Sequence, residues 1–491
     1  MKRSWEGWLY GVSLVAMAAG SLVLAPGQAN AADITITMAA PDWPPTRFMK
    51  EEFDRSFKSE SGNNIKLEMD YIPWPSFYER VAASLTSGEQ KYQMIVTDSQ
   101  WLGSFVDGGY YKDLTEEIKN DPELSAIMKD LHPALISAYS TYPNKSPQFV
   151  KDNPFPAPDT HYYGFPQFPD TYVTYYRKDL FCNETEAKKF QESFNQKLPC
   201  TYEDWQDVDW TVYENIGKHF MRKKGDPLGD GVADDDFFGV SFQAGKSYDF
   251  SSMQVNAFIW QNGGEIWDET RQPEAQAEGV VNSDINVKAF EQYLNFIQYM
   301  PPVAKTGQAD IFVIQDLYMQ GKTATTIDWV GLGEPVLDPK TSRVSDKSAF
   351  GPAPGVRKED GKIDRTGNIG GQPFVLTTWN SPEVDAAALE VVKWWLKPET
   401  QKKFAANGGQ SGLMSVMADP EYDSLRPWNR AHKEMLDWQR DVWHVPEFFE
   451  LLTQQQEEFD KAITGQITAQ EALDSVARFQ QQTLEDAGRI E

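Results

Sequence analysis

"ITITMAAPDWPP", residues 34–45, joins an apolar strand-like run to a loop that carries an aspartate, a tryptophan and prolines, and residues with helical spacing follow it. The same order recurs in "IKLEMDYIPWPS" (65–76) and again in "QMIVTDSQW" (93–101), each followed by a helical pattern. Strand, loop and helix repeated three times are typical of a mostly parallel sheet with helices on its faces. The sequence therefore predicts an α/β fold.

The three loops share a composition suited to binding. Each contains a tryptophan and two contain an aspartate, and in such sheets the ligand crevice lies at the carboxyl ends of the strands. The loops therefore predict a shared binding crevice made by Asp42, Trp43, Trp74, Asp98, Ser99 and Trp101. Asp98 could instead cap the helix that begins at Ser99, and the two roles are compatible.

The bulk composition narrows the class of protein. A length of 491 residues exceeds one ordinary core and predicts two or three domains. The formal charge of −27, with no block of basic residues, argues against nucleic acid or an anionic membrane as a partner. A hydrophobic content of 40% with 13% aromatic residues indicates a folded globular protein.

Residues 1–32 follow a different pattern. Lys2 and Arg3 precede the apolar run "WLYGVSLVAMAAGSLVLA", and small residues at 29–32 offer a cleavage site, as in a secretory signal peptide. The alternative is an uncleaved membrane anchor, since the apolar run approaches spanning length. Cleavage predicts an exported protein, located in the periplasm.

Two cysteines, Cys182 and Cys200, flank a short polar helical segment. In an oxidising compartment this pair is expected to form a disulfide. The alternative is two separately buried thiols.

A second acidic motif is "GDPLGDGVADDDFFG", residues 225–239. Asp226, Asp230 and Asp234 take positions 1, 5 and 9 of a calcium-binding loop, but Leu228 and Phe237 occupy positions that need oxygen ligands. A solvated acidic turn is the favoured interpretation and a calcium site is the alternative. No cofactor is required by any other motif, and phosphate-binding and hydrolase motifs are absent.

Eight segments in order resemble the family 1 extracellular solute-binding proteins of bacterial ABC importers, the carbohydrate-binding group. They are "YGFPQFPDTYVTYYRKDLF" (163–181), "TYEDW" (201–205), "FIWQNGGEIWDE" (258–269), "GKTATTIDWVG" (321–331), "FGPAPG" (350–355), "GGQPFVLTTWNSPE" (370–383), "WWLKPETQKKFAANGGQSGLMS" (394–415) and "GQITAQEALDSV" (465–476). The chain differs from the family by extra sequence near 128–161 and 420–447.

This resemblance implies two α/β lobes joined by crossing strands, with a ligand cleft between them. The N-terminal lobe would comprise 33–165 plus 325–370, and the C-terminal lobe 166–324 plus 371–491. Crossings would fall near 170–176, 323–328 and 370–377. It also implies a sugar or polyol ligand, a membrane permease as partner, and a monomer that is not an enzyme.

Further site residues are expected at the crossings and in the second lobe. They are Asp170, Tyr172, Trp260, Asn262, Trp329, Gly371 and Gln372. Trp260 could instead lie on the side of its helix that faces the protein core. Aromatic rings stack on the apolar faces of sugars while short polar side chains bond their hydroxyls, so this set suits a sugar. The rival hypotheses are a secreted glycoside hydrolase with a carboxylate pair across the cleft, and a surface adaptor without a small ligand.

Overall fold

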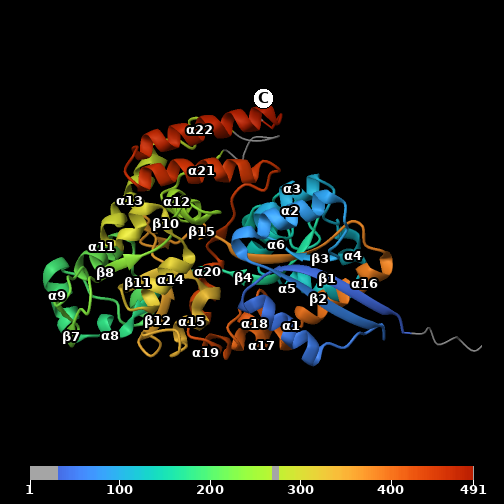
Figure 1. Ribbon diagram of the computed structural model, residues 1–491, viewed down its shortest axis with the longest axis horizontal. Coiled ribbons are helices and arrows are strands. Elements are labelled where there is room, and N and C mark those ends of the chain that lie inside the picture. Colours follow the sequence, from blue (N-terminus) through green and yellow to red (C-terminus); the bar gives the residue numbers. More distant parts are fainter. Residues whose placement is uncertain (1–30, 268–275, 490–491) are drawn as a thin grey trace, which may run out of the picture.

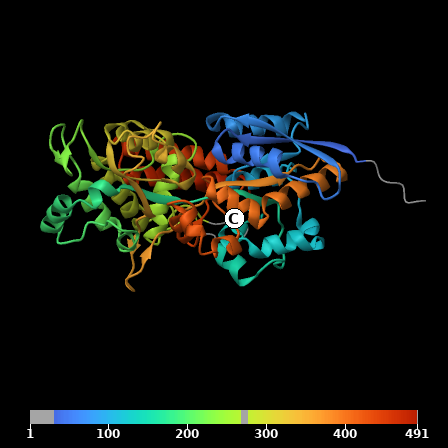
Figure 2. The same ribbon diagram turned by 90° about the horizontal axis from the view of Figure 1, so that it is seen from below.

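The computed structural model describes residues 31–267 and 276–489, which form two α/β lobes lying side by side (Figures 1 and 2). All but the last two residues of the predicted signal peptide, 1–32, lie outside the described residues. Within the described part of the chain, no helix is long and apolar enough to cross a membrane.

The first lobe is built on a five-stranded sheet in the order β2-β1-β3-β16-β4. β1 (Asp33–Pro41) lies between β2 (Asn64–Ile72) and β3 (Met94–Val96), and the three run parallel as the repeats predict. β16 (Gly370–Leu376) pairs antiparallel with both β3 and β4 (Gly164–Asp170).

Both faces of this sheet are covered. Met38 and Val96 belong to one apolar cluster, while their neighbours Ala39 and Ile95 belong to another on the opposite face. The strands are therefore apolar on both sides, as parallel strands between helices are. The helices of this lobe are α1 (Pro44–Ser56), α2 (Phe77–Ser87), α3 (Leu102–Asp107), α4 (Thr115–Asn120), α5 (Pro122–Asp130), α6 (Pro133–Tyr139), α7 (Pro147–Asp152), α16 (Pro382–Trp395), α17 (Pro398–Ala406), α18 (Met414–Met417) and α19 (Tyr422–Leu425), with the 3-10 turns η1 (Trp74–Ser76) and η2 (Ser99–Trp101).

The second lobe contains a four-stranded sheet in the order β12-β5-β11-β8. β5 (Tyr172–Arg177) is antiparallel to β11 (Thr323–Trp329) and β12 (Ser348–Pro352), and β8 (Phe238–Ser241) is parallel to β11. Every residue of α12 (Phe250–Gln261) is buried, which is typical of a helix enclosed by other elements.

The other helices of this lobe surround the sheet, and the pair at the C-terminus lies along one edge of the molecule (Figure 1). They are α8 (Lys178–Phe181), α9 (Glu184–Phe194), α10 (Tyr202–Trp205), α11 (Trp210–His219), α13 (Asp284–Phe296), α14 (Ile311–Met319), α15 (Gly333–Leu337), α20 (Asn429–Leu436), α21 (Phe448–Ile463) and α22 (Ala469–Asp486), with the 3-10 turns η3 (Ile297–Tyr299), η4 (Pro302–Thr306) and η5 (Val330–Leu332). The remaining strands are two-residue pairs: β6 (Pro227–Leu228), β7 (Gly231–Val232), β9 (Ala244–Gly245), β10 (Gln308–Ala309), β13 (Val356–Arg357), β14 (Ile363–Asp364), β15 (Gly367–Asn368) and β17 (Gln439–Arg440).

The strand pairing differs from the predicted division of the chain. β11 and β12 lie in the second sheet, so most of 325–370 does not belong to the first lobe. β16 and α16 to α19 pack in the first lobe, so 371–491 is not a single part of the second. The chain crosses at Thr171, within the predicted 170–176, and returns just before Gly370, at the edge of the predicted 370–377. The crossing predicted at 323–328 is wrong, because β11 lies wholly in the second sheet, and a further crossing follows α19. An apolar run fits either sheet equally well, and pairing partners distant in sequence decide between them.

Cys182 and Cys200 form the predicted disulfide, which joins the end of α8 to the segment after α9. In the acidic loop, Asp226 accepts a hydrogen bond from the Lys223 backbone and Asp230 accepts one from Asn183. No three His, Cys, Asp or Glu side chains in the described residues are grouped to hold a metal ion. The predicted calcium ligands therefore do not converge.

Candidate ligand-binding site

A cavity lies between the two lobes, at the carboxyl ends of the first-lobe strands. Its volume is about 60 Å³, which holds a handful of waters at roughly 10–15 Å³ each. The lining residues are Trp43, Pro44, Pro45, Trp74, Asp98, Gln100, Phe168, Asp170, Asp249, Phe250, Ile311, Trp329, Gly331, Leu332, Ile369, Gly370, Gly371 and Gln372.

One wall is a pair of stacked indoles from the first lobe. Trp43 precedes α1, where prolines at the first helical positions fix the start of the helix. Its ring lies 4.8 Å from that of Trp74 at an interplanar angle of 20°. Both come from the strand-end loops that the sequence singles out, and together they form an aromatic platform.

The opposite wall comes from the second lobe. Trp329 ends β11 and stacks on Tyr172, with ring centroids 3.8 Å apart at 21°. Gly370 backs this indole, and a Cβ atom there would lie 2.4 Å from the ring. The glycine therefore allows the first-lobe strand β16 to approach Trp329 closely.

Three carboxylates line the space between these walls. Asp98 accepts hydrogen bonds from the Gln100 backbone at 3.1 Å and from the Tyr248 hydroxyl at 3.2 Å. Asp170 accepts from the Gly331 backbone at 3.1 Å, and Asp249 from the Gln100 side chain at 3.0 Å. Asp98 thus caps η2, as one interpretation expected, and it also lines the cavity.

Burial raises the pKa values of these three carboxyl groups. It raises the pKa of Asp170 to about 8 despite the backbone N–H groups of Gly331, Thr171 and Val330, which lower it. It raises the pKa of Asp249 to about 7 despite the hydrogen bond from Gln100. Burial, then the charges of Asp249 and Asp441, hold the pKa of Asp98 well above its usual value. Burial thus favours the protonated form of all three carboxyl groups.

Two residues of the second lobe connect directly to the first. The Trp101 indole N–H donates to the Tyr248 hydroxyl at 2.6 Å, and that hydroxyl donates to Asp98. The neighbouring Asp249 accepts from Gln100. These contacts, with the small cavity, define a closed arrangement of the lobes.

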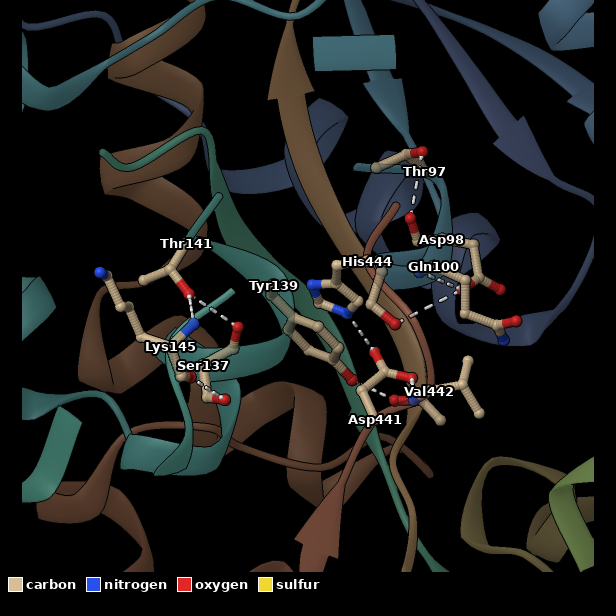
Figure 3. Close-up of polar contacts among 12 residues, drawn as sticks. Thr97, Asp98, Gln100, Ser137, Tyr139, Thr141, Lys145, Asp441, Val442 and His444 are labelled. Carbon is tan, nitrogen blue, oxygen red and sulfur yellow. Dashed lines mark hydrogen bonds and ion pairs between the residues drawn. The ribbon is translucent and has the colours of Figure 1, made fainter. Parts of the chain in front are cut away.

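Figure 3 shows a buried pair behind this region, Asp441 and His444, beside Tyr139 and near the Asp98–Gln100 turn. His444 Nε2 lies 2.9 Å from Asp441 Oδ2. Both belong to the extra sequence 420–447, so this segment supplies part of the wall between the lobes.

Seven of the thirteen predicted ligand residues line the cavity. They are Trp43, Trp74, Asp98, Asp170, Trp329, Gly371 and Gln372.

The other six lie elsewhere, and three belong to the first-lobe loops. Asp42 is exposed and pairs with Arg47. Trp101 is completely buried in the core under α2, and Ser99 is buried beside Asp98. Within η2 the side chains diverge, so that Gln100 lines the cavity while the Trp101 ring packs in the core of the lobe.

The remaining three belong to the second lobe. Tyr172 lies behind Trp329 and supports it. Trp260 is buried in α12, as its alternative interpretation expected, and Arg440 covers its ring at 4.4 Å. Asn262 bonds the Phe258 carbonyl of its own helix. A helix buried on all sides gives no sequence signal for the face that meets a ligand.

The sequence did not predict several of the lining residues. Among them, Gln100 and Asp249 offer polar groups to a ligand, and Phe168 offers an aromatic ring. Gln100 stands inside the quoted "TDSQW", and Phe168 two residues before Asp170 on β4. Their places at strand ends were a usable signal. Asp249 precedes α12 without any motif, and only the docking of the lobes brings it to the cavity.

Comparison with known proteins gives a consistent result. Residues 40–402 match the model of the family described as bacterial extracellular solute-binding protein. No curated protein sequence matches the chain.

Solved structures share the fold at low identity. A solute-binding protein from Agrobacterium radiobacter K84 in complex with ribitol is 19% identical, with a TM-score of 0.66 over 92% of this chain and 98% of that one. A protein from Agrobacterium vitis S4 with bound D-mannitol is 17% identical, with a TM-score of 0.66 over 93% and 99%. Maltose-bound MalE3 of T. maritima is 17% identical, with a TM-score of 0.65 over 92% and 100%.

Proposed function

Because the chain belongs to the bacterial extracellular solute-binding protein family, we propose that it captures a sugar or polyol for an ABC importer. The observation that carries this proposal is the pairing of the Trp43–Trp74 platform with Trp329 across one cavity, with carboxylates between them. Indoles cover the C–H faces of a sugar or polyol, and carboxylates accept strongly from its hydroxyls. Solved relatives of the same fold hold ribitol, D-mannitol and maltose.

Capture follows from the division of the site between lobes. Trp43, Trp74 and Asp98 come from one lobe, and Trp329 and Asp249 from the other. A ligand contacts both sets only when the lobes are closed. It therefore binds the closed state more tightly than the open state and shifts the equilibrium toward closure. Because residues of both lobes line the cavity, separation of the lobes would open it to a ligand.

The proposal also includes the export of the protein, its location and its partner. Residues 1–32 direct export and are removed, and the mature protein works as a periplasmic monomer that delivers ligand to a membrane permease. The strongly acidic composition suits a partner other than nucleic acid.

A thermal-shift screen of the mature protein against sugars and polyols tests this function, because a ligand bound only by the native state raises its stability. Trp43→Ala and Trp329→Ala should each abolish the shift given by the best ligand. Trp379→Ala is the matched control, since its indole donates to the Tyr92 carbonyl away from the cavity. An unchanged shift in both cavity variants would place the site elsewhere.

The same samples distinguish binding from hydrolysis. Chromatography of an oligosaccharide after incubation should recover it intact. Sustained cleavage that is lost on replacing a cavity carboxylate would favour the glycoside hydrolase instead.

A further inference from the structure

The cavity between the lobes is lined by acidic groups without a compensating base. Asp98, Asp170 and Asp249 are its charged residues, and no Lys, Arg or His is among the described residues that line it. Asp98 and Asp170 are each 5% exposed. Three carboxylates therefore face one small space that excludes most water.

Several other buried carboxylates in this protein have cationic partners, although Asp328, 1% exposed, has none among the described residues. Glu186, which is fully buried, lies 2.8 Å from His219 and 3.0 Å from Arg222. Glu52 contacts both Arg55 and Lys403. Burying a carboxylate is costly unless a cation or several donors compensate it, so three such groups without a cation around one cavity differ from the paired Glu52 and Glu186.

Unused acceptors give a second and independent indication. Gln372, 2% exposed, lines the cavity, and its Oε1 accepts no hydrogen bond from any described residue. Gln100, 3% exposed, donates to Asp249 through Nε2 while its Oε1 is likewise unpartnered. Other buried glutamines of the described residues also have unpartnered Oε1 atoms, but Gln100 and Gln372 are the ones that line the cavity. The missing donors are those a ligand would bring.

The walls also suit a positive charge. Trp43 and Trp74 line the cavity from one lobe and Trp329 lines it from the other. Indole is the aromatic ring that attracts cations most strongly, and the attraction grows when the cation is desolvated.

We propose that the ligand of this cavity is a polyhydroxylated amine, an amino sugar or amino polyol, whose ammonium group lies among Asp98, Asp170 and Asp249. This inference rests on the proposed function and narrows its ligand class. The hydroxyls donate to Gln100 and Gln372, and the indoles cover the carbon skeleton. The raised pKa values of Asp170 and Asp249 agree with it, because an ammonium group beside these carboxyl groups favours their charged form and displaces their protons.

Calorimetric titration with matched pairs tests the proposal. Glucosamine is compared with glucose and with N-acetylglucosamine, and 1-amino-1-deoxyglucitol with glucitol. The ammonium member of a pair should bind about tenfold tighter or more, since charge-assisted hydrogen bonds exceed neutral ones by that order. Acetylation should remove the gain. Titrations in buffers of different ionisation enthalpy should show proton release with the amines only.

Isosteric variants locate the effect. Asp249→Asn and Asp170→Asn should reduce the preference for the amine and its proton release, while the exposed Asp42→Asn should change neither. Neutral members that bind as tightly as the amines, or more tightly, would overturn the inference and leave the proposed function intact. Absence of binding by both classes would reject both.

Discussion

The Tyr248 hydroxyl links the two lobes, and Tyr248→Phe removes it with little change in volume. In the closed protein this oxygen accepts from the Trp101 indole N–H and donates to Asp98. Trp101 is completely buried there, so the variant leaves its N–H without an acceptor. When the lobes separate, Tyr248 moves away and water can reach that N–H, so the cost falls on the closed state.

The size of the effect follows from the group left unpaired. A buried donor without an acceptor costs about 1–3 kcal/mol. Because ligand binding is coupled to closure, the whole cost appears in affinity, and about 1.4 kcal/mol corresponds to a factor of ten. We therefore expect ligand to bind roughly 5- to 150-fold more weakly.

Calorimetric titration of the strongest ligand of the screen measures this change. Tyr78→Phe is the control, because Tyr78 stacks on Phe449 across the same junction but its hydroxyl bonds no described residue. Thermal unfolding without ligand should differ little between the two variants. An affinity within twofold of the unaltered protein would refute the role assigned to Tyr248.

Three further outcomes are expected. Burial raises the pKa of Glu186, but hydrogen bonds from His219 and a backbone N–H, with a nearby arginine, lower it to about 2. Glu186→Gln should therefore lose about 3 kcal/mol of unfolding free energy above pH 5 and progressively less as pH falls toward 2, measured by urea unfolding. Asp170 binds its proton more tightly in the folded protein, so the free energy of unfolding decreases as the pH rises from about 4 to about 8. This group contributes about 1.4 kcal/mol per pH unit to the decrease, and Asp170→Asn should abolish that contribution. Gly370→Ala places a methyl group against the Trp329 ring, and the resulting overpacking of about 1–3 kcal/mol should appear as weaker ligand binding in fluorescence titrations.

Local pattern and strand topology together predict the first-lobe half of the site. Trp43, Trp74 and Asp98 follow apolar runs whose carboxyl ends must meet at one edge of a parallel sheet. That geometry is a property of the repeat itself, so it needs no knowledge of the second lobe. The same argument fails for Trp101, because a turn only three residues long decides whether its ring faces the cleft or the core.

The second-lobe half depends on contacts that sequence does not encode locally. Asp249 reaches the cavity only because the lobes dock, and the lobe that holds β12 is decided by its pairing with a strand about 170 residues earlier. Trp260 shows the related difficulty that α12 is apolar on every side. Long-range pairing and docking therefore account for the wrong division of lobes and for the missed residues.

The disulfide has a practical consequence for observing the lobes in solution. Since the chain has two cysteines and both are in this bond, cysteines introduced on the surface would be the only free thiols of the protein. Glu79 and Lys246 are exposed on opposite lobes and border one surface hollow. Dyes attached at these two positions would convert closure into an optical signal, turning the binding protein into a sensor for its own ligand.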